Sequence, residues 1–227
     1  MKNIVVLTGA GISAESGIKT FRDADGLWEG HDVMEVATPK GFNDNPELVF
    51  NFYNQRRRQL KEVIPNKAHE NLVTLEKHFK VNIVTQNVDD LHERAGSSNI
   101  LHLHGELNKV RSTFNESFVY SWKNDLFLGN KCERGYQLRP HIVWFGEAVP
   151  MLDKAIEITE TADMLVIIGT SMQVYPAASL INFIRKNTPF YFIDPKPSIS
   201  ESEFENLTII QESAVTGTEI LLKKLIG

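Results

Sequence analysis

The stretch Leu7–Gly17, with the sequence LTGAGISAESG, decides how the rest of this chain is interpreted. It continues a short apolar run that begins at Asn3, and such a run ending in closely spaced glycines is typical of a strand that meets a phosphate group. Gly9 allows a tight turn, Gly11 lets the main chain approach a pyrophosphate, and Ala14 packs the next helix on the strand. That helix would point its free N–H groups at the anion. The pattern alone is weak, because many strand-to-helix turns use glycine without binding any ligand.

The composition is that of a globular protein and excludes several classes of function. A length of 227 residues suits one large α/β domain, or one domain with a smaller insertion. The formal net charge of −5 argues against broad affinity for nucleic acid or anionic membranes. The single cysteine, Cys132, excludes an internal disulfide, and no apolar stretch suits a membrane span or a signal peptide. We therefore expect a cytoplasmic protein without nucleic-acid or membrane partners, and its oligomeric state stays open.

Alternating patterns along the chain predict the fold class. Short apolar runs rich in β-branched residues predict buried strands at residues 4–7, 81–84, 164–168, 190–193 and 207–210. Helical patterns lie between several of them, at residues 68–79 and 176–185. Near the end of the chain, Thr216 and Glu219 form a capping-box pattern ahead of a last helix. The alternation predicts an α/β fold with a Rossmann-like, doubly wound parallel sheet.

Two segments do not fit this alternation, residues 26–65 and residues 107–140. We expect both to be insertions that together form a smaller lobe. The larger, Rossmann-like domain then consists of residues 1–25, 66–106 and 141–227.

Two polar clusters follow predicted strands, at the edge where open α/β sheets bind ligands. The first is Thr85–His92, which includes Asn87 and Asp89. Asp90 and Glu93 have the spacing of a helix cap, so a structural role is favoured for Asp90.

The second cluster is His102–Glu106, in which alternation places His102 and His104 on one face of a strand. Two histidines at this spacing suggest a metal as readily as a catalyst. Gly105 opens the backbone beside His104, however, and leaves that imidazole room at the edge of a ligand. A histidine near its ordinary pKa of about 6.5 is suited to accept a proton at neutral pH.

Together with further motifs, these segments resemble the sirtuin family of NAD-dependent protein deacylases. The motifs lie in the family's order along most of the chain: residues 9–13 (GAGIS), 16–18 (SGI), Phe21-Arg22, 85–89 (TQNVD), His104-Gly105, 143–147 (VWFGE) and 169–171 (GTS) with Val174. An ordered set of this kind is far more specific than any one glycine motif.

The resemblance implies an NAD site and a role for each matching residue. The pyrophosphate and ribose of NAD would be held by Gly9, Ala10, Gly11, Ser13, Gly169, Thr170 and Ser171, with Ala214 in the same site. Phe21 and Arg22 would lie on a loop over the nicotinamide end, Gln86 and Asn87 would contact the nicotinamide ribose, and Asp89 would hold the carboxamide. His104 would be the general base, with Asn87 as a second catalytic residue. Asp194 stands where the family more often has Asn; it can still accept from ribose hydroxyls and would disfavour a 2′-phosphate.

The resemblance also implies that an acyl-lysine peptide adds as a strand to the segment Val143, Trp144, Phe145, Gly146 and Glu147, through main-chain hydrogen bonds. The amide oxygen is a poor nucleophile, so the site must place it beside C1′ of the ribose as nicotinamide leaves. His104 would then remove a ribose hydroxyl proton. The products would be free lysine, nicotinamide and O-acyl-ADP-ribose.

The segment Asn45–Leu60 predicts a helix, with Asn45 as cap and proline in the first turn. A step of about 100° per residue places Tyr53 and Arg56 on its apolar face, while Arg57 and Arg58 turn towards solvent. The Tyr-x-x-Arg pair matches the sirtuin branch that removes succinyl, malonyl or glutaryl groups, and Ala37 matches the small residue of its acyl pocket. The resemblance therefore predicts desuccinylase and demalonylase activity, with deacetylation retained.

Most sirtuins bind a structural zinc through four cysteines after the His-Gly motif, whereas this chain has only Cys132 there. We therefore predict no zinc. Residues 107–140, called the insertion from here on, carry several aromatic residues. We expect these to form a small core in place of the metal: Phe114, Phe118, Tyr120, Trp122, Phe127 and Tyr136.

Three other functions remain open from the sequence. A non-enzymatic NAD or ADP-ribose sensor would follow if the insertion does not hold a peptide. An NAD hydrolase or ADP-ribosyltransferase needs the same cofactor site but not the acyl-lysine features. A plain dehydrogenase is the weakest alternative, because residues 86–89 resemble a site for glycosidic-bond chemistry.

Overall fold

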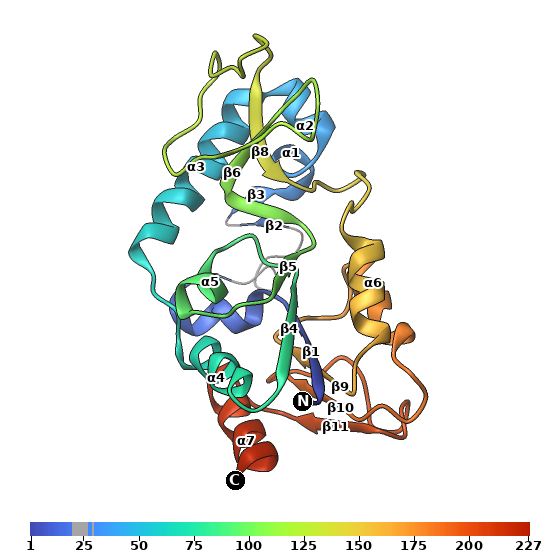
Figure 1. Ribbon diagram of the computed structural model, residues 1–227. Helices are drawn as coiled ribbons and strands as arrows, with labels where there is room; N and C mark the ends of the chain where they lie inside the picture. The colour runs from blue at the N-terminus through green and yellow to red at the C-terminus, as the bar shows by residue number, and fades with distance from the viewer. Residues whose placement is uncertain (20–26, 29) are drawn as a thin grey trace.

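The computed structural model describes residues 1–19, 27–28 and 30–227 of the chain. Its centre is a six-stranded parallel sheet in the order β11-β10-β9-β1-β4-β5 (Figure 1). The strands are β1 (Asn3–Thr8), β4 (Lys80–Thr85), β5 (Ile100–His102), β9 (Met164–Ile168), β10 (Phe190–Ile193) and β11 (Leu207–Ile210). The chain builds the sheet outwards from β1 in both directions, which leaves a topological switch point between β1 and β9. The predicted α/β fold with a doubly wound parallel sheet is confirmed.

Both faces of this sheet are covered, which explains the continuous apolar runs in its strands. Ile4 and Val6 of β1 pack with α4 (Lys67–Glu76) and α7 (Ala214–Ile226), whereas Val5 and Leu7 pack on the opposite face. That face is covered by α6 (Leu152–Glu160) and by η3 (Ala177–Phe183). The helical pattern at residues 176–185 corresponds to η3, which is a 3-10 helix.

Two helices begin with caps that the sequence did not indicate. Helix α7 begins at Ala214, so the expected capping box at Thr216 and Glu219 is wrong, because Thr216 already lies inside the helix. The carboxylate of Glu15 takes the capping role instead, accepting from the Ser213 hydroxyl at 3.1 Å and from the Val215 N–H at 2.9 Å.

The cap expected from Asp90 is also wrong. At the start of α5 (Leu91–Ala95), the Leu91 N–H donates to Asp89 Oδ1 at 3.1 Å, while Asp90 Oδ2 accepts from Asn108 Nδ2 at 3.0 Å. The neighbouring β6 strand supplies Asn108, and this long-range partner draws the Asp90 side chain away from the helix.

The remaining elements lie together at one end of the molecule (Figure 1). They are the helices α1 (Val33–Val36), α2 (Pro39–Asp44) and α3 (Pro46–Glu62), the hairpin of β2 (Leu27–Trp28) and β3 (His31–Asp32), and an antiparallel sheet of β6 (Gly105–Ser112), β7 (Val119–Ser121) and β8 (Leu138–Ile142). The antiparallel sheet extends slightly beyond both ends of the segment 107–140, and the division into two lobes stays a prediction. Within the described residues, no helix has the length and apolar character that crossing a bilayer requires.

The aromatic core expected in the insertion is wrong. Phe114, Phe127 and Tyr136 are 51%, 58% and 43% exposed. The buried cluster is instead made of Phe50, Val110, Leu126, Cys132 and Leu138, with Phe42, Tyr120 and Trp122 packed against it. Helix α3 supplies Phe50 to this cluster, so residues 107–140 pack on the helix rather than around aromatic residues of their own.

Helix α3 begins as predicted, because Asn45 Oδ1 accepts from the Leu48 N–H at 3.0 Å. The expectation that Arg57 faces solvent is wrong. Its side chain is buried, with Nε donating to the Leu107 carbonyl and Nη1 to Asn54 Oδ1, each at 2.9 Å. Burial lowers the pKa of Arg57 to about 10. The antiparallel sheet packs on a side of α3 that helical periodicity alone assigns to solvent, whereas Arg58 is exposed as predicted.

Candidate active site

One cleft of about 1050 Å³ brings together most of the residues singled out in the sequence. It lies at the carboxyl ends of β1, β4, β9 and β10 and reaches helix α3 and the segment after β8. The predicted residues that line it are Gly9, Ala10, Gly11, Ala37, Tyr53, Gln86, Asn87, Asp89, His104, Val143, Trp144, Phe145, Gly146, Glu147, Gly169, Thr170, Ser171, Asp194 and Ala214. Phe21 and Arg22 lie outside the described residues.

The glycine turn after β1 is packed against a second turn after β9. The Gly11 N–H donates to the Gly169 carbonyl at 2.8 Å, and a Cβ built on Gly11 would lie 2.5 Å from the Cα of Gly169. Gly11 is therefore required by a contact between two main chains as well as by any ligand. The expected packing role of Ala14 is wrong, because Ala14 is exposed in the 3-10 helix η1 (Ala10–Ser16), and Ile12 and Ser13 are buried instead.

Ser13, Asn87 and Asp89 form a compact polar group at one end of the cleft. The Ser13 hydroxyl donates to Asp89 Oδ2 at 3.0 Å and accepts from Asn87 Nδ2 at 3.2 Å. Burial raises the pKa of Asp89, although its hydrogen bonds from Leu91 and Ser13 act in the opposite direction. The group presents amide and carboxyl functions at the cleft surface, and these can recognise a carboxamide or a sugar hydroxyl.

His104 has the tautomer that a general base needs. Its Nδ1 lies 3.1 Å from the carbonyl oxygen of Gln86, and because a carbonyl only accepts, Nδ1 carries the hydrogen. The other nitrogen, Nε2, then keeps its lone pair. Burial lowers the pKa of His104, so the ring is neutral at pH 7 and can accept a proton.

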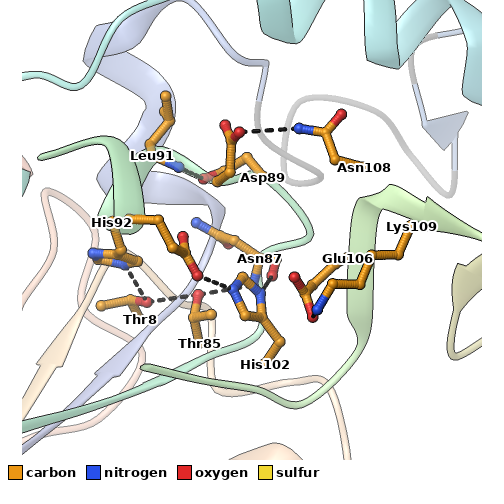
Figure 2. Close-up of polar contacts among 12 residues, drawn as sticks. Thr8, Thr85, Asn87, Asp89, Leu91, His92, His102, Glu106, Asn108 and Lys109 are labelled. Carbon is orange, nitrogen blue, oxygen red and sulfur yellow. Dashed lines mark hydrogen bonds and ion pairs between the residues drawn. The ribbon is translucent and has the colours of Figure 1, made fainter. Parts of the chain in front are cut away.

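His102 has the opposite character, although it lies two residues away. Its Nδ1 lies 3.0 Å from the Asn87 carbonyl and its Nε2 lies 2.7 Å from Glu93 Oε1, so both nitrogens face acceptors (Figure 2). Burial alone would lower the pKa of His102, but the hydrogen bond and charge of Glu93 outweigh it and raise that pKa. His102 therefore acts as a charged clamp on the main chain at Asn87. Strand β5 ends at His102, so the expectation that both histidines share one strand face is wrong.

A row of buried hydrogen bonds supports the main chain at Gln86 and Asn87. Thr8 Oγ1 donates to Thr85 Oγ1 at 2.8 Å and lies 3.1 Å from His92 Nε2 (Figure 2). Thr85 Oγ1 also accepts from the Asn87 N–H at 3.0 Å. The ends of β1 and β4 are thus joined through side chains, which fixes the main chain that carries Gln86 and Asn87.

The far end of the cleft has groups suited to a nucleotide. Gln86 Nε2 donates to Thr170 Oγ1 at 3.1 Å, which links the turn after β4 to the turn after β9. Asp194 is buried at the end of β10 and its Oδ1 accepts from the Lys196 N–H at 2.8 Å. A carboxylate at this point of a dinucleotide fold can accept from ribose hydroxyls.

The end of the cleft beside α3, which we call its acyl end after the role expected from the sequence, is lined by Ala37, Tyr53, Trp144 and Trp28. Tyr53 is fully buried, and its hydroxyl oxygen accepts from Trp144 Nε1 at 2.9 Å. Arg56 is half-buried one turn later on α3, with its Cζ 4.4 Å from the centre of the Phe52 ring. It is not among the described residues that line the cleft.

The segment 143–147 follows strand β8 as a turn rather than as a strand, with the Glu147 N–H donating to the Trp144 carbonyl at 3.0 Å. The N–H groups of Val143 and Phe145 donate to the carbonyls of His104 and Ala37, each at 2.9 Å. The N–H groups of Val143 and Phe145 are therefore already used within the chain.

Comparison with known proteins agrees with this geometry. The Sir2 family model matches residues 9–176. An NAD-dependent protein deacylase of Helicobacter pylori (strain ATCC 700392 / 26695) is 62% identical over 226 residues, covering 100% of this chain and 98% of the relative. A crystal structure of a Sir2 homolog–NAD complex superposes with a TM-score of 0.88 at 39% identity, covering 98% of this chain and 89% of that chain. A Sir2 variant with a deacetylated p53 peptide and 3′-O-acetyl-ADP-ribose gives a TM-score of 0.83 at 28% identity, covering 98% and 93%.

This chain belongs to the Sir2 family. The sirtuin is an NAD-dependent protein deacylase, as its sequence motifs predicted. Its cleft fits NAD by its donors and acceptors, with amide and hydroxyl groups at Asn87 and Thr170 and a carboxylate at Asp194. Ser13 does not line the cleft; it is buried behind Asn87 and Asp89 and holds both side chains.

Some residues that hold the sirtuin's site in place were missed in the sequence. Asn66 Nδ2 donates to the Ile12 carbonyl at 2.8 Å and to Ser16 Oγ at 3.0 Å, which ties η1 to the start of α4. Its position before a helix marks Asn66 as a cap but gives no sign of these distant partners. Glu15 and Trp28 have no local signal, because their contacts are formed only by the folded chain.

Proposed function

We propose that this sirtuin removes acidic acyl groups, succinyl and malonyl, from lysine side chains, and acetyl groups as well. The single observation that carries the proposal is that Tyr53 and Ala37 line the same cleft as His104. Arg56 follows Tyr53 by one turn of α3, and we infer that its guanidinium is the charge partner of the acyl carboxylate. The small side chain of Ala37 leaves room for the longer acyl chain.

The residues around the cleft support the chemistry of such a deacylase. NAD supplies the ribose carbon that the acyl oxygen attacks and the nicotinamide that leaves. We infer that Asn87 and Asp89 orient the nicotinamide end, that Thr170 and Asp194 hold the adenosine side, and that His104 Nε2 accepts a ribose hydroxyl proton. One water molecule is consumed when the lysine amine leaves, and the products are nicotinamide, free lysine and O-acyl-ADP-ribose.

Acylated protein or peptide substrates are the partners of this enzyme class. The Sir2 structure with a deacetylated p53 peptide concerns that relative, and we infer a similar extended peptide beside residues 143–147 here. Because the N–H groups of Val143, Trp144 and Phe145 are used within the chain, the peptide's own N–H groups would bond to carbonyls of this segment. Recognition through the main chain places little demand on the peptide sequence.

We also propose that the insertion holds no structural zinc. Among the described residues, no three His, Cys, Asp or Glu side chains gather in a way that suits a metal ion. Cys132 is buried, with its Sγ 3.4 Å from Ser112 Oγ. The residues present at this position therefore do not fit a four-ligand zinc site.

The acyl preference is tested by mass spectrometry of NAD reactions with acetyl-, succinyl- and malonyl-lysine versions of one peptide. We expect the mass of the matching O-acyl-ADP-ribose with each peptide. The Arg56→Met variant should lose turnover of the succinyl peptide selectively, by about tenfold or more, since one charged hydrogen bond contributes roughly 1.5–3 kcal/mol. Arg58→Met is the matched control on the exposed side of the same helix. Equal losses on acetyl and succinyl peptides in Arg56→Met would refute this role.

A further inference from the structure

We propose that Trp144 is a positioning residue that makes the Tyr53 hydroxyl a hydrogen-bond donor towards the acyl group and thereby favours acidic acyl chains. This inference rests on the proposed acyl preference. It gives a role in that preference to the Trp144 side chain, in addition to those of Tyr53, Ala37 and Arg56. Both side chains line the acyl end of the cleft.

The direction of the hydrogen bond between the two residues carries the argument. Trp144 Nε1 lies 2.9 Å from the Tyr53 hydroxyl oxygen, and an indole N–H can only donate. The Tyr53 oxygen is therefore the acceptor, and its own hydrogen must point elsewhere. Within the part of the chain that the structure describes, no acceptor takes that hydrogen. The O–H is left for a group inside the cleft.

A carboxylate is the partner that suits such a donor. It accepts without donating, and hydrogen bonds to an ionised acceptor are about twice as strong as neutral ones. An uncharged acyl chain of the same length offers no acceptor and leaves the buried O–H unpaired, which is unfavourable. The tyrosine therefore separates succinyl from butyryl only while Trp144 holds it in the donating orientation.

Trp144 itself is held on its main chain and on its ring by one ion-pair cluster. The Trp144 N–H donates to Glu147 Oε2 at 2.8 Å, and Arg139 bonds to both oxygens of Glu147, at 2.6 Å and 3.1 Å. The Arg139 Cζ also lies 3.3 Å from the centre of the Trp144 ring. Arg111 adds a further bond to Glu147 Oε2 at 3.1 Å. Glu147 thus holds the main chain of Trp144 while Arg139 covers its ring. The indole cannot rotate away from Tyr53 without losing its contact with Arg139.

The test is a double-mutant cycle with Tyr53→Phe and Trp144→Phe, measuring kcat/KM on succinyl-lysine and butyryl-lysine versions of one peptide. These acyl chains have equal length and differ in the carboxylate. We expect each single variant to lower the succinyl-to-butyryl ratio by about tenfold, which corresponds to about 1.4 kcal/mol. Adding Trp144→Phe to Tyr53→Phe should not lower the ratio further. Trp122→Phe is the control, because its indole donates to the Asp125 carbonyl in the insertion.

The outcomes separate this inference from the proposed function. A wild-type enzyme that does not turn over succinyl-lysine overturns both. A wild-type preference for succinyl that persists in Trp144→Phe, or that falls further in the double variant than in Tyr53→Phe, overturns the positioning role alone. If Trp144→Phe does not fold, Arg139→Lys tests the same step, because it keeps the charge beside Glu147 but removes the planar group over the indole. An unchanged ratio in that variant, or in Tyr53→Phe, is equally contrary to the inference.

Discussion

Two buried histidines, His69 and His92, lie against each other beneath the strands that carry the active-site loops. Their ring centres are 5.0 Å apart, and both side chains are almost inaccessible to solvent. Burial lowers the pKa of His69 to about 4 and holds that of His92 well below its ordinary value. Both rings are therefore neutral in the folded protein at pH 7, and neither can be charged without cost.

This residue-scale feature predicts that the protein loses stability in mild acid. The unfolded chain binds protons at these histidines below about pH 6.5, whereas the folded chain resists doing so until about pH 4 for His69. The contribution of the two neutral rings to the free energy of unfolding is therefore complete above about pH 6.5 and decreases as the pH falls below that value. The expected slope is up to about 1.4 kcal/mol per pH unit for each ring. Urea unfolding between pH 7 and pH 5 measures it.

The variant that isolates this effect is His69→Gln, which does not titrate in this range and should reduce the slope. His78→Gln is the control, since His78 is exposed. Other buried groups contribute to the pH dependence as well, such as Asp89, whose pKa is raised by burial, so the comparison between variants carries the test. Identical slopes in wild type and His69→Gln would count against the assignment.

At the scale of elements, helix α3 joins the acyl end of the cleft to the insertion. One side of it presents Tyr53 to the cleft. Another presents Arg57 to strand β6 and Asn54 to the loop between β7 and β8. The Asn54 side chain pairs with both main-chain groups of Leu126, accepting from its N–H at 2.8 Å and donating to its carbonyl at 2.9 Å. These buried hydrogen bonds hold the insertion on the helix.

We therefore expect Asn54→Ala to destabilise the insertion. The substitution leaves the main-chain groups of Leu126 and one guanidinium N–H of Arg57 without these partners, and such losses cost roughly 1–3 kcal/mol each. The expected results are a lower urea midpoint and faster hydrogen exchange over residues 126–138. Arg58→Ala is the control, because its ion pair with Asp125 at 3.6 Å is exposed and contributes less than about 1 kcal/mol. An unchanged midpoint in Asn54→Ala would mean that the insertion is held by other contacts.

At the scale of the whole molecule, the cleft is bounded by the parallel sheet on one side and by α3 and the segment after β8 on the other. Its shape therefore depends on how firmly the insertion is held beside the sheet. Buried groups of α3 and the cluster around Leu126 and Cys132 provide that attachment in the described residues.

If no zinc contributes, removing metal should change neither stability nor activity. A structural zinc supplies roughly 10–16 kcal/mol in small modules, so a zinc-dependent insertion would unfold when treated with a chelator. We expect the same melting temperature and the same turnover before and after chelation, and after zinc is added back. Metal analysis of the purified protein is the direct measurement. One tightly held zinc per chain would contradict the proposal.

The central sheet and most of the cleft could be predicted because their signals are local. A strand buried on both faces is apolar along its whole length, so β1, β4, β9, β10 and β11 are visible as runs of residues. The glycine and polar motifs follow directly after such strands, and parallel strands bring their carboxyl ends to one edge. The same holds for the start of α3, where the cap at Asn45 involves a neighbour three residues away.

Sequence alone therefore determined the fold class, the family and most of the residues that line the cleft. Tertiary structure alone decided the burial of Arg57, the cap that Glu15 gives to α7 and the bond from Trp144 to Tyr53. These contacts join residues 50, 200 and 91 positions apart in the chain. Helical and strand periodicity describes only which way a side chain leaves its own element. What it meets there depends on which distant element packs against that side, and this is fixed only when the whole chain is folded.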